Sequence, residues 1–115
     1  MIVGISETSF ESGKVFTFTY SYNKELSKTQ TIYETLGLRN IKFKRMSKFE
    51  QASFLDSKRS EFIRRGIVQA LECFGDNNAS NQPDQIVIYR DGVGGEQFQE
   101  KYLERELPEL QKIIY

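Results

Sequence analysis

The stretch that decides the fold is IVIYRDGVGGEQF, residues 86–98. Its first four residues are apolar or aromatic, so both sides of an extended chain are apolar here, as in a central strand that is covered on both faces. The glycines that follow Asp91 predict a turn. Apolar side chains then recur at helical spacing from Glu96 onward, up to an interruption at Pro108. The stretch therefore predicts a strand, a turn and a helix.

Patterns nearer the N-terminus predict the remaining strands. MIVGIS (residues 1–6) is a short apolar strand, followed by a polar turn over residues 7–14. KVFTFTYSY (residues 14–22) alternates strictly between aromatic and smaller side chains, which is the period of a β-strand. Residues 29–36 are the expected antiparallel partner, and IKFKRM (residues 41–46) alternates as a further candidate strand.

A helical period follows these strands. Asp56 or Ser57 can cap the start of the helix, and Gly75 suits its C-terminal end. The apolar stripe consists of Ile63, Ile67, Ala70, Leu71 and Phe74. The order strand, strand, strand, helix, strand, helix predicts a mixed α/β sheet within one domain, residues 1–115.

The composition excludes several classes of protein. The chain has 38% hydrophobic and 28% charged residues, which is ordinary for a globular domain, and its formal net charge is zero. No histidine and only one cysteine are present, so zinc clusters and histidine-based catalytic triads are excluded. No stretch reaches the roughly 18 apolar residues of a membrane span, so no membrane partner is expected. Because Cys73 cannot form an internal disulfide, we expect a reducing compartment, the cytoplasm or the nucleus.

The middle of the chain is basic. Between residues 39 and 48 there are five basic residues and no acid: Arg39, Lys42, Lys44, Arg45 and Lys48. The last four are candidates for contacts with the phosphates of a nucleic acid. A solvated charged face is the alternative interpretation.

Asp91 is the strongest candidate for a functional residue. In open α/β sheets, ligands gather at the carboxyl ends of strands, where Asp91 is expected. A carboxylate at such a place can coordinate Mg²⁺ or transfer a proton. Alternatively, Asp91 and Gly92 only form a turn and cap the next helix.

IVIYRDGVGGEQF followed by ERELPEL closely resembles the Piwi domain of Argonaute and Piwi proteins. MIVGIS is similar to the first strand of that family, in which Met-Ile-Val-Gly is followed by one residue and then aspartate. The resemblance implies an RNase H-like mixed sheet, incomplete at the C-terminus. It also implies binding of a small guide RNA and a target RNA in RNA silencing.

In the members of this family that cleave RNA, carboxylates hold two Mg²⁺ or Mn²⁺ ions on either side of the scissile phosphate. By this resemblance, Asp91 matches the second aspartate and a metal ligand, while Ser6 occupies the position of the first. Glu61 is the best match for an inserted glutamate, or else it is a solvated helix residue paired with Arg65. Glu7 points to the sheet face opposite Ser6 in a regular strand.

Because a neutral hydroxyl is a poor replacement for a carboxylate that bridges two divalent ions, we expect a pseudo-nuclease that binds RNA without cutting it. An active metal-dependent endoribonuclease is the first alternative, and a protein-interaction module derived from the Piwi fold is the second. The family's next strand and last metal ligand would follow Tyr115. The chain is therefore expected to be either a piece of a longer protein or a shortened relative, and to need the remainder or a partner chain.

Overall fold

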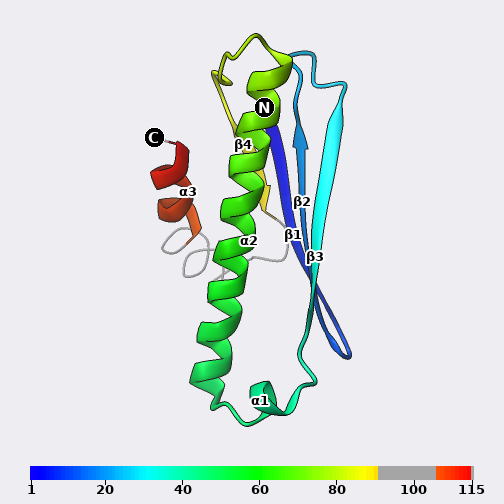
Figure 1. Ribbon diagram of the computed structural model, residues 1–115, viewed down its shortest axis with the longest axis vertical. Helices are drawn as coiled ribbons and strands as arrows, with labels where there is room; N and C mark the ends of the chain where they lie inside the picture. The colour runs from blue at the N-terminus through cyan, green and yellow to red at the C-terminus, as the bar shows by residue number, and fades with distance from the viewer. Residues whose placement is uncertain (91–105, 115) are drawn as a thin grey trace.

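The computed structural model describes residues 1–90 and 106–114. In chain order its elements are β1 (Ile2–Phe10), β2 (Gly13–Ser21), β3 (Thr29–Gly37), α1 (Ile41–Lys44), α2 (Lys48–Asn77), β4 (Val87–Arg90) and α3 (Leu107–Ile114). The long helix α2 runs along one face of the sheet, and α3 lies beside α2 (Figure 1). None of the helices in these two segments is long and apolar enough to cross a membrane.

The four strands form one mixed sheet in the order β3-β2-β1-β4. Both β1–β2 and β2–β3 are antiparallel, and β4 lies parallel to β1 with Ile5 opposite Arg90. The mixed α/β sheet expected from the sequence is therefore confirmed. The prediction of a central position for β4 is wrong for the described residues, because β4 lies at the edge of the sheet and Tyr89 is 64% exposed.

The hydrophobic core lies between the sheet and α2. Alternate strand residues point toward α2 and are buried: Val3, Ile5, Phe16, Phe18 and Tyr20. The predicted stripe on α2 meets them with Ile63, Ile67, Ala70 and Phe74, and Leu110 of α3 completes the cluster. A glycine is needed at position 66, because a Cβ there would lie 2.6 Å from the ring of Phe18.

The segment 41–46 is a short helix, not the predicted strand. Asn40 caps this helix by accepting a hydrogen bond from the backbone N–H of Phe43 at 2.7 Å. The ring of Phe43 packs against Phe54, with ring centroids 5.7 Å apart. The alternation of apolar and basic residues was misleading, because Ile41 does not join a buried face and is 68% exposed.

The boundaries of two further elements also differ from the predictions. The N-cap of α2 is Ser47 rather than Asp56 or Ser57, and it forms a capping box with Glu50. The helix continues through Gly75 to Asn77. Strand β1 runs to Phe10 instead of turning after Ser6, since its pairing with β2 continues to Gly13. Pro108 lies in the first turn of α3, where a missing N–H is tolerated.

Candidate functional site

Ser6 lies on the side of the sheet that faces away from α2. Its hydroxyl forms a hydrogen bond with the hydroxyl of Thr17 on β2. The parallel pairing of β1 and β4 ends at Ile5 and Arg90, which are the residues immediately before Ser6 and Asp91 in the sequence. The predicted site residue Asp91 lies outside the described residues.

Glu61 belongs to α2 and therefore to the layer on the other side of the sheet from the Ser6 side chain. Its side chain is 63% exposed and lies 4.0 Å from Lys58 Nζ. Arg65, which was its expected partner, instead pairs with Glu34 at 2.7 Å. The structure does not bring Ser6 and Glu61 together.

Glu7 lies on the helix side of the sheet, opposite Ser6, as the alternation predicted. The register of β1 and β2 is regular from Val3 to Phe10, so no bulge turns Glu7 toward Ser6. Both oxygens of Glu7 accept hydrogen bonds from Arg59, at 2.7 and 2.9 Å. Lys14 Nζ is 3.0 Å from the same carboxylate.

The described residues do not fit a two-metal centre. Ser6 is neutral, and Glu61 is exposed on α2. Glu7 is already paired with the side chains of Arg59 and Lys14 on the face of the sheet that is covered by α2. Across residues 1–90 and 106–114, no group of three or more acidic or cysteine side chains gathers as metal ligands would. No catalytic step through metal ions follows from these residues.

The strongest electrostatic feature is a buried cluster of ion pairs that sequence reasoning missed. Arg59 also binds Asp56 at 2.6 Å. Arg90 binds Glu106 through two hydrogen bonds of 2.8 and 3.0 Å and lies 3.6 Å from Glu7. These contacts link β1, β4 and α2 to the residue that precedes α3, and they hold the strand end that leads to Asp91.

The pKa values follow from these contacts. Burial raises the pKa of Glu7, but the hydrogen bonds from Arg59 and Lys14 outweigh it and lower that pKa to about 2. For Arg59, burial lowers the pKa, and the bonds to Glu7 and Asp56 outweigh burial and raise it above its ordinary value. Both groups therefore remain charged near neutral pH, so this cluster is suited to holding elements together rather than to proton transfer.

The free energy of unfolding should fall at acid pH because of Glu7. The pKa of its carboxylate is lower in the folded chain, about 2, than its ordinary value of 4.5. The stabilisation is complete above pH 4.5 and is lost as the pH falls toward 2. Glu7→Gln lacks this group, so it should lose less stability than the wild type between about pH 5 and 2.5. Urea unfolding across this range measures the difference, and parallel pH profiles would contradict the assignment.

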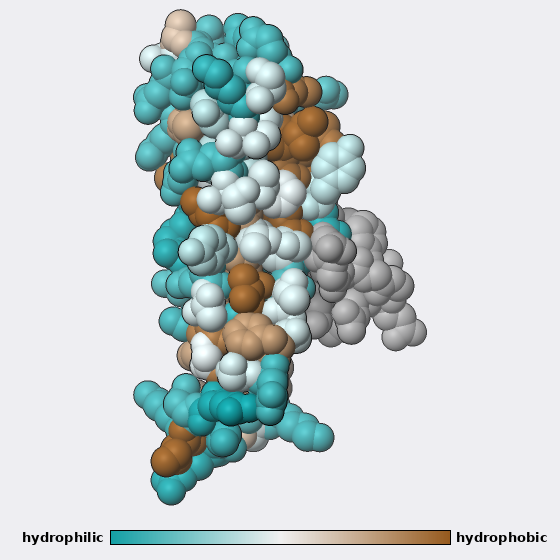
Figure 2. Space-filling model, turned by 90° about the vertical axis from the view of Figure 1, so that its right-hand side faces the viewer, coloured by the Kyte–Doolittle hydropathy of each residue, from teal (hydrophilic) through white to brown (hydrophobic). Residues whose placement is uncertain are grey.

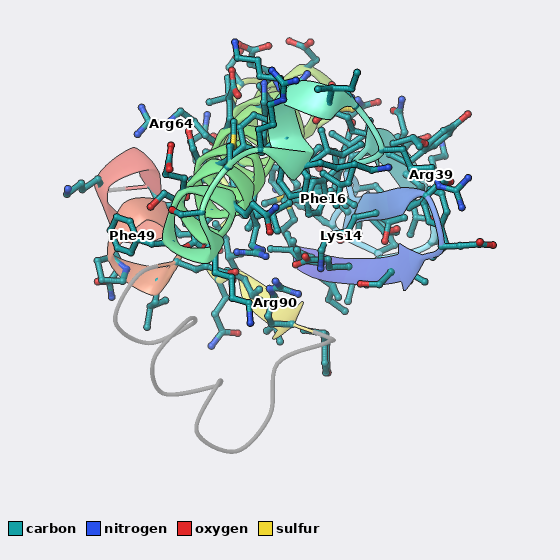
Figure 3. All side chains as sticks on the ribbon, turned by 90° about the horizontal axis from the view of Figure 1, so that it is seen from below. Lys14, Phe16, Arg39, Phe49, Arg64 and Arg90 are labelled. Carbon is teal, nitrogen blue, oxygen red and sulfur yellow. The ribbon has the colours of Figure 1, made fainter. Side chains whose placement is uncertain are left out.

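The four candidate phosphate contacts gather at one end of the molecule. Lys42 and Lys44 belong to α1, Arg45 caps it, and Lys48 begins α2. All four are exposed, and none forms an ion pair with another described residue. This end lies opposite the N-terminus (Figure 1), and from below Arg39 and Phe49 project from it on different sides (Figure 3).

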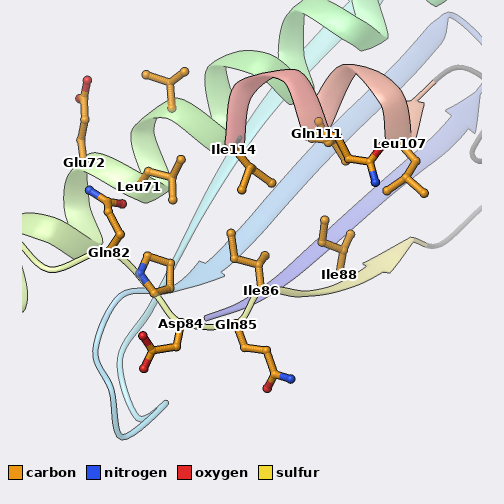
Figure 4. Close-up of a pocket in the computed structure, with 13 residues that line it drawn as sticks. Leu71, Glu72, Gln82, Asp84, Gln85, Ile86, Ile88, Leu107, Gln111 and Ile114 are labelled. Atoms are coloured by element: carbon orange, nitrogen blue, oxygen red, sulfur yellow. The ribbon is translucent and has the colours of Figure 1, made fainter.

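A groove of about 700 Å³ lies between α2, α3 and the segment that leads into β4 (Figure 4). Each of these three elements contributes apolar side chains to its lining, for example Leu71 of α2, Ile86 before β4 and Leu110 of α3. The acidic residues in the lining are Glu72 and Asp84. Within residues 1–90 and 106–114, none of the predicted site residues lines this groove. Sequence patterns could not indicate it, because it exists only where three separate segments pack.

Comparison with known proteins leaves the family open. No protein-family model and no curated protein sequence matches this chain.

Proposed function

We propose that this chain is a Piwi-like, small-RNA-guided nucleic-acid-binding segment without cleavage activity. One observation carries the proposal: β4 is parallel to β1 and directly beside it, with Ile5 opposite Arg90. The two strands that match the aspartate-bearing strands of the Piwi family by sequence are thus neighbours. The crossover between β3 and β4 through a helix that covers one face also agrees with the RNase H-like arrangement that the resemblance implies.

The expected lack of cleavage rests on the charge around Ser6. Two-metal catalysis needs several carboxylates to neutralise two divalent ions. Ser6 contributes only a hydroxyl, which is already paired with Thr17. Glu7 cannot replace it without breaking its bonds to Arg59 and Lys14 on the opposite face.

Binding of RNA is supported by the basic end of the molecule. Lys42, Lys44, Arg45 and Lys48 are exposed cations with no acid among them in the sequence. Lysine and arginine that neutralise phosphates release counterions, which makes such binding tighter at low salt. We propose that this end contacts the backbone of the guide RNA, the target RNA or both.

Fluorescence anisotropy with a labelled single-stranded RNA and with a guide–target duplex tests this function. We expect the logarithm of the affinity to fall linearly with the logarithm of the salt concentration. Replacing all four basic residues by glutamine should make this negative slope shallower by about 3. It should also weaken binding at least about tenfold at low salt. Lys24→Gln/Lys28→Gln, in the exposed turn between β2 and β3, is the control for removal of charge elsewhere.

A folded sample that shows no salt-dependent binding to either RNA would overturn the proposal and favour the protein-interaction module. The same samples incubated with Mg²⁺ or Mn²⁺ should leave the RNA intact. Metal-dependent cleavage that is abolished by Asp91→Ala would instead establish the alternative of an active endoribonuclease.

A further inference from the structure

The distribution of charge on the sheet is the reverse of what solvation alone would produce. The four strands contain the charged residues Glu7, Lys14, Glu34 and Arg90. All four point to the α2 side, where they pair with one another, with α2 or with Glu106. We call the other side the open face. It consists of the even-numbered residues of β1 and the odd-numbered residues of β2, β3 and β4, and none of them is charged.

Several hydroxyl groups on the open face already have partners within the sheet. Ser6 is bonded to Thr17, Thr19 is bonded to Thr31 at 2.8 Å, and Ser21 accepts the backbone N–H of Ile2 at 2.8 Å. A polar group that is already hydrogen-bonded loses little when water is removed from it. This part of the face can therefore be buried at low cost.

The open face also carries exposed apolar and aromatic side chains, whose removal from water would favour binding of a partner. Tyr33 is 74% exposed and Tyr89 is 64% exposed, on opposite edges of the sheet. Ile2 and Val87 are also exposed. Figure 2 shows a pale and brown band along this side of the molecule, with hydrophilic groups at both ends and along one edge. A solvated antiparallel face ordinarily carries charged residues in these places.

The absence of charged side chains indicates which kind of partner could bind the open face. A phosphate backbone or a charged protein surface would be dehydrated here without any opposite charge, which is costly. The same face of a second copy brings no charge and presents the same internally bonded hydroxyls. The strands cover about 500 Å² per copy, so two copies would bury about 1,000 Å², the lower end of specific interfaces.

We propose that two copies of the chain pack open face against open face as a sheet-on-sheet dimer. Stacked sheets lie about 10 Å apart, with the side chains of the two inner faces interdigitated. An interface of this size is typical of weak, reversible association. The dimer would cover Ser6 on the open face, whereas the proposed RNA contacts lie at the basic end of the molecule. Dimerisation and RNA binding are therefore measured separately and can fail separately.

Sedimentation velocity over a range of concentrations tests the dimer. The wild type should change from monomer to dimer as its concentration rises. Tyr33→Lys should raise the dissociation constant at least tenfold, because it places two unpaired ammonium groups in the interface. Phe49→Lys is the matched control, since Phe49 is 80% exposed but lies on α2, away from the open face, and it should leave dimerisation unchanged.

Tyr89→Lys repeats the test from the opposite edge of the sheet, and circular dichroism of each variant checks that it is folded. A wild type that stays monomeric at every concentration would overturn the proposal. If both Tyr33→Lys and Tyr89→Lys still dimerise as the wild type does, the dimer contact lies elsewhere on the molecule, and the proposal is overturned. A monomer whose RNA affinity falls in Tyr33→Thr would assign the open face to nucleic acid and would also refute the dimer.

Discussion

Replacing Arg59 by alanine is expected to lower the free energy of unfolding by about 3–5 kcal/mol. The side chain of Arg59 is 8% exposed, and that of Glu7 is 11% exposed. Without the guanidinium, Glu7 keeps only Lys14 and the more distant Arg90 as cationic partners. A carboxylate that is buried with fewer partners costs much more than the loss of a solvated ion pair. Urea unfolding at neutral pH measures the effect.

Arg65→Ala provides the matched control, because it also removes an arginine from α2. Arg65 pairs with Glu34 at 2.7 Å, close to the shortest Arg59–Glu7 distance, but both side chains are substantially exposed. Exposed pairs contribute about 0–1 kcal/mol, so this variant should unfold almost as the wild type does. Equal losses in the two variants would show that burial does not govern the Arg59 cluster.

Gly66→Ala is expected to destabilise the protein by about 1–3 kcal/mol, although alanine favours helices more than glycine does. A Cβ at this position would lie 2.6, 2.7 and 2.9 Å from three ring carbons of Phe18. Phe18 of β2 is fully buried between the sheet and α2 and cannot move aside without disturbing the core. The overpacking should therefore outweigh the gain in helix propensity.

Gly75→Ala tests the same substitution in the same helix without the clash. The nearest atom to an added Cβ is the side-chain Nε2 of Gln82, at 3.7 Å, which is an ordinary contact. This variant should be more stable than the wild type by up to about 1 kcal/mol. Thermal unfolding of both variants should give changes of opposite sign, and a common sign would refute the account of Gly66.

The parts of the fold that could be predicted were those encoded by local period. The alternation in KVFTFTYSY placed Phe16, Phe18 and Tyr20 on one face, and they are buried. The helical stripe on α2 was also identified correctly. The strand predicted for residues 41–46 was wrong, because a short run of alternating residues fits a strand or a capped turn of helix equally well. The capping side chain of Asn40 and the contact with Phe54 decide for the helix.

The candidate site could be predicted only in part, for a different reason. The opposite orientation of Ser6 and Glu7 follows from the strand period alone. The partners of Glu7 do not, because Arg59 lies 52 residues away in sequence. Ion pairs of this kind leave no periodic signal, so the buried cluster had to be found in three dimensions. The predictions for Asp91 concern a residue outside the described part of the chain and remain predictions.

The ion pair between Arg90 and Glu106 joins the two residues that flank segment 91–105. The two ends of this segment are therefore joined by a contact whose side chains are 3% and 5% exposed. The entropy of closing a loop grows only slowly with its length, by about 0.6 kcal/mol for each doubling. A change in the number of residues between Arg90 and Glu106 should therefore cost little stability while this ion pair keeps β4 joined to the start of α3.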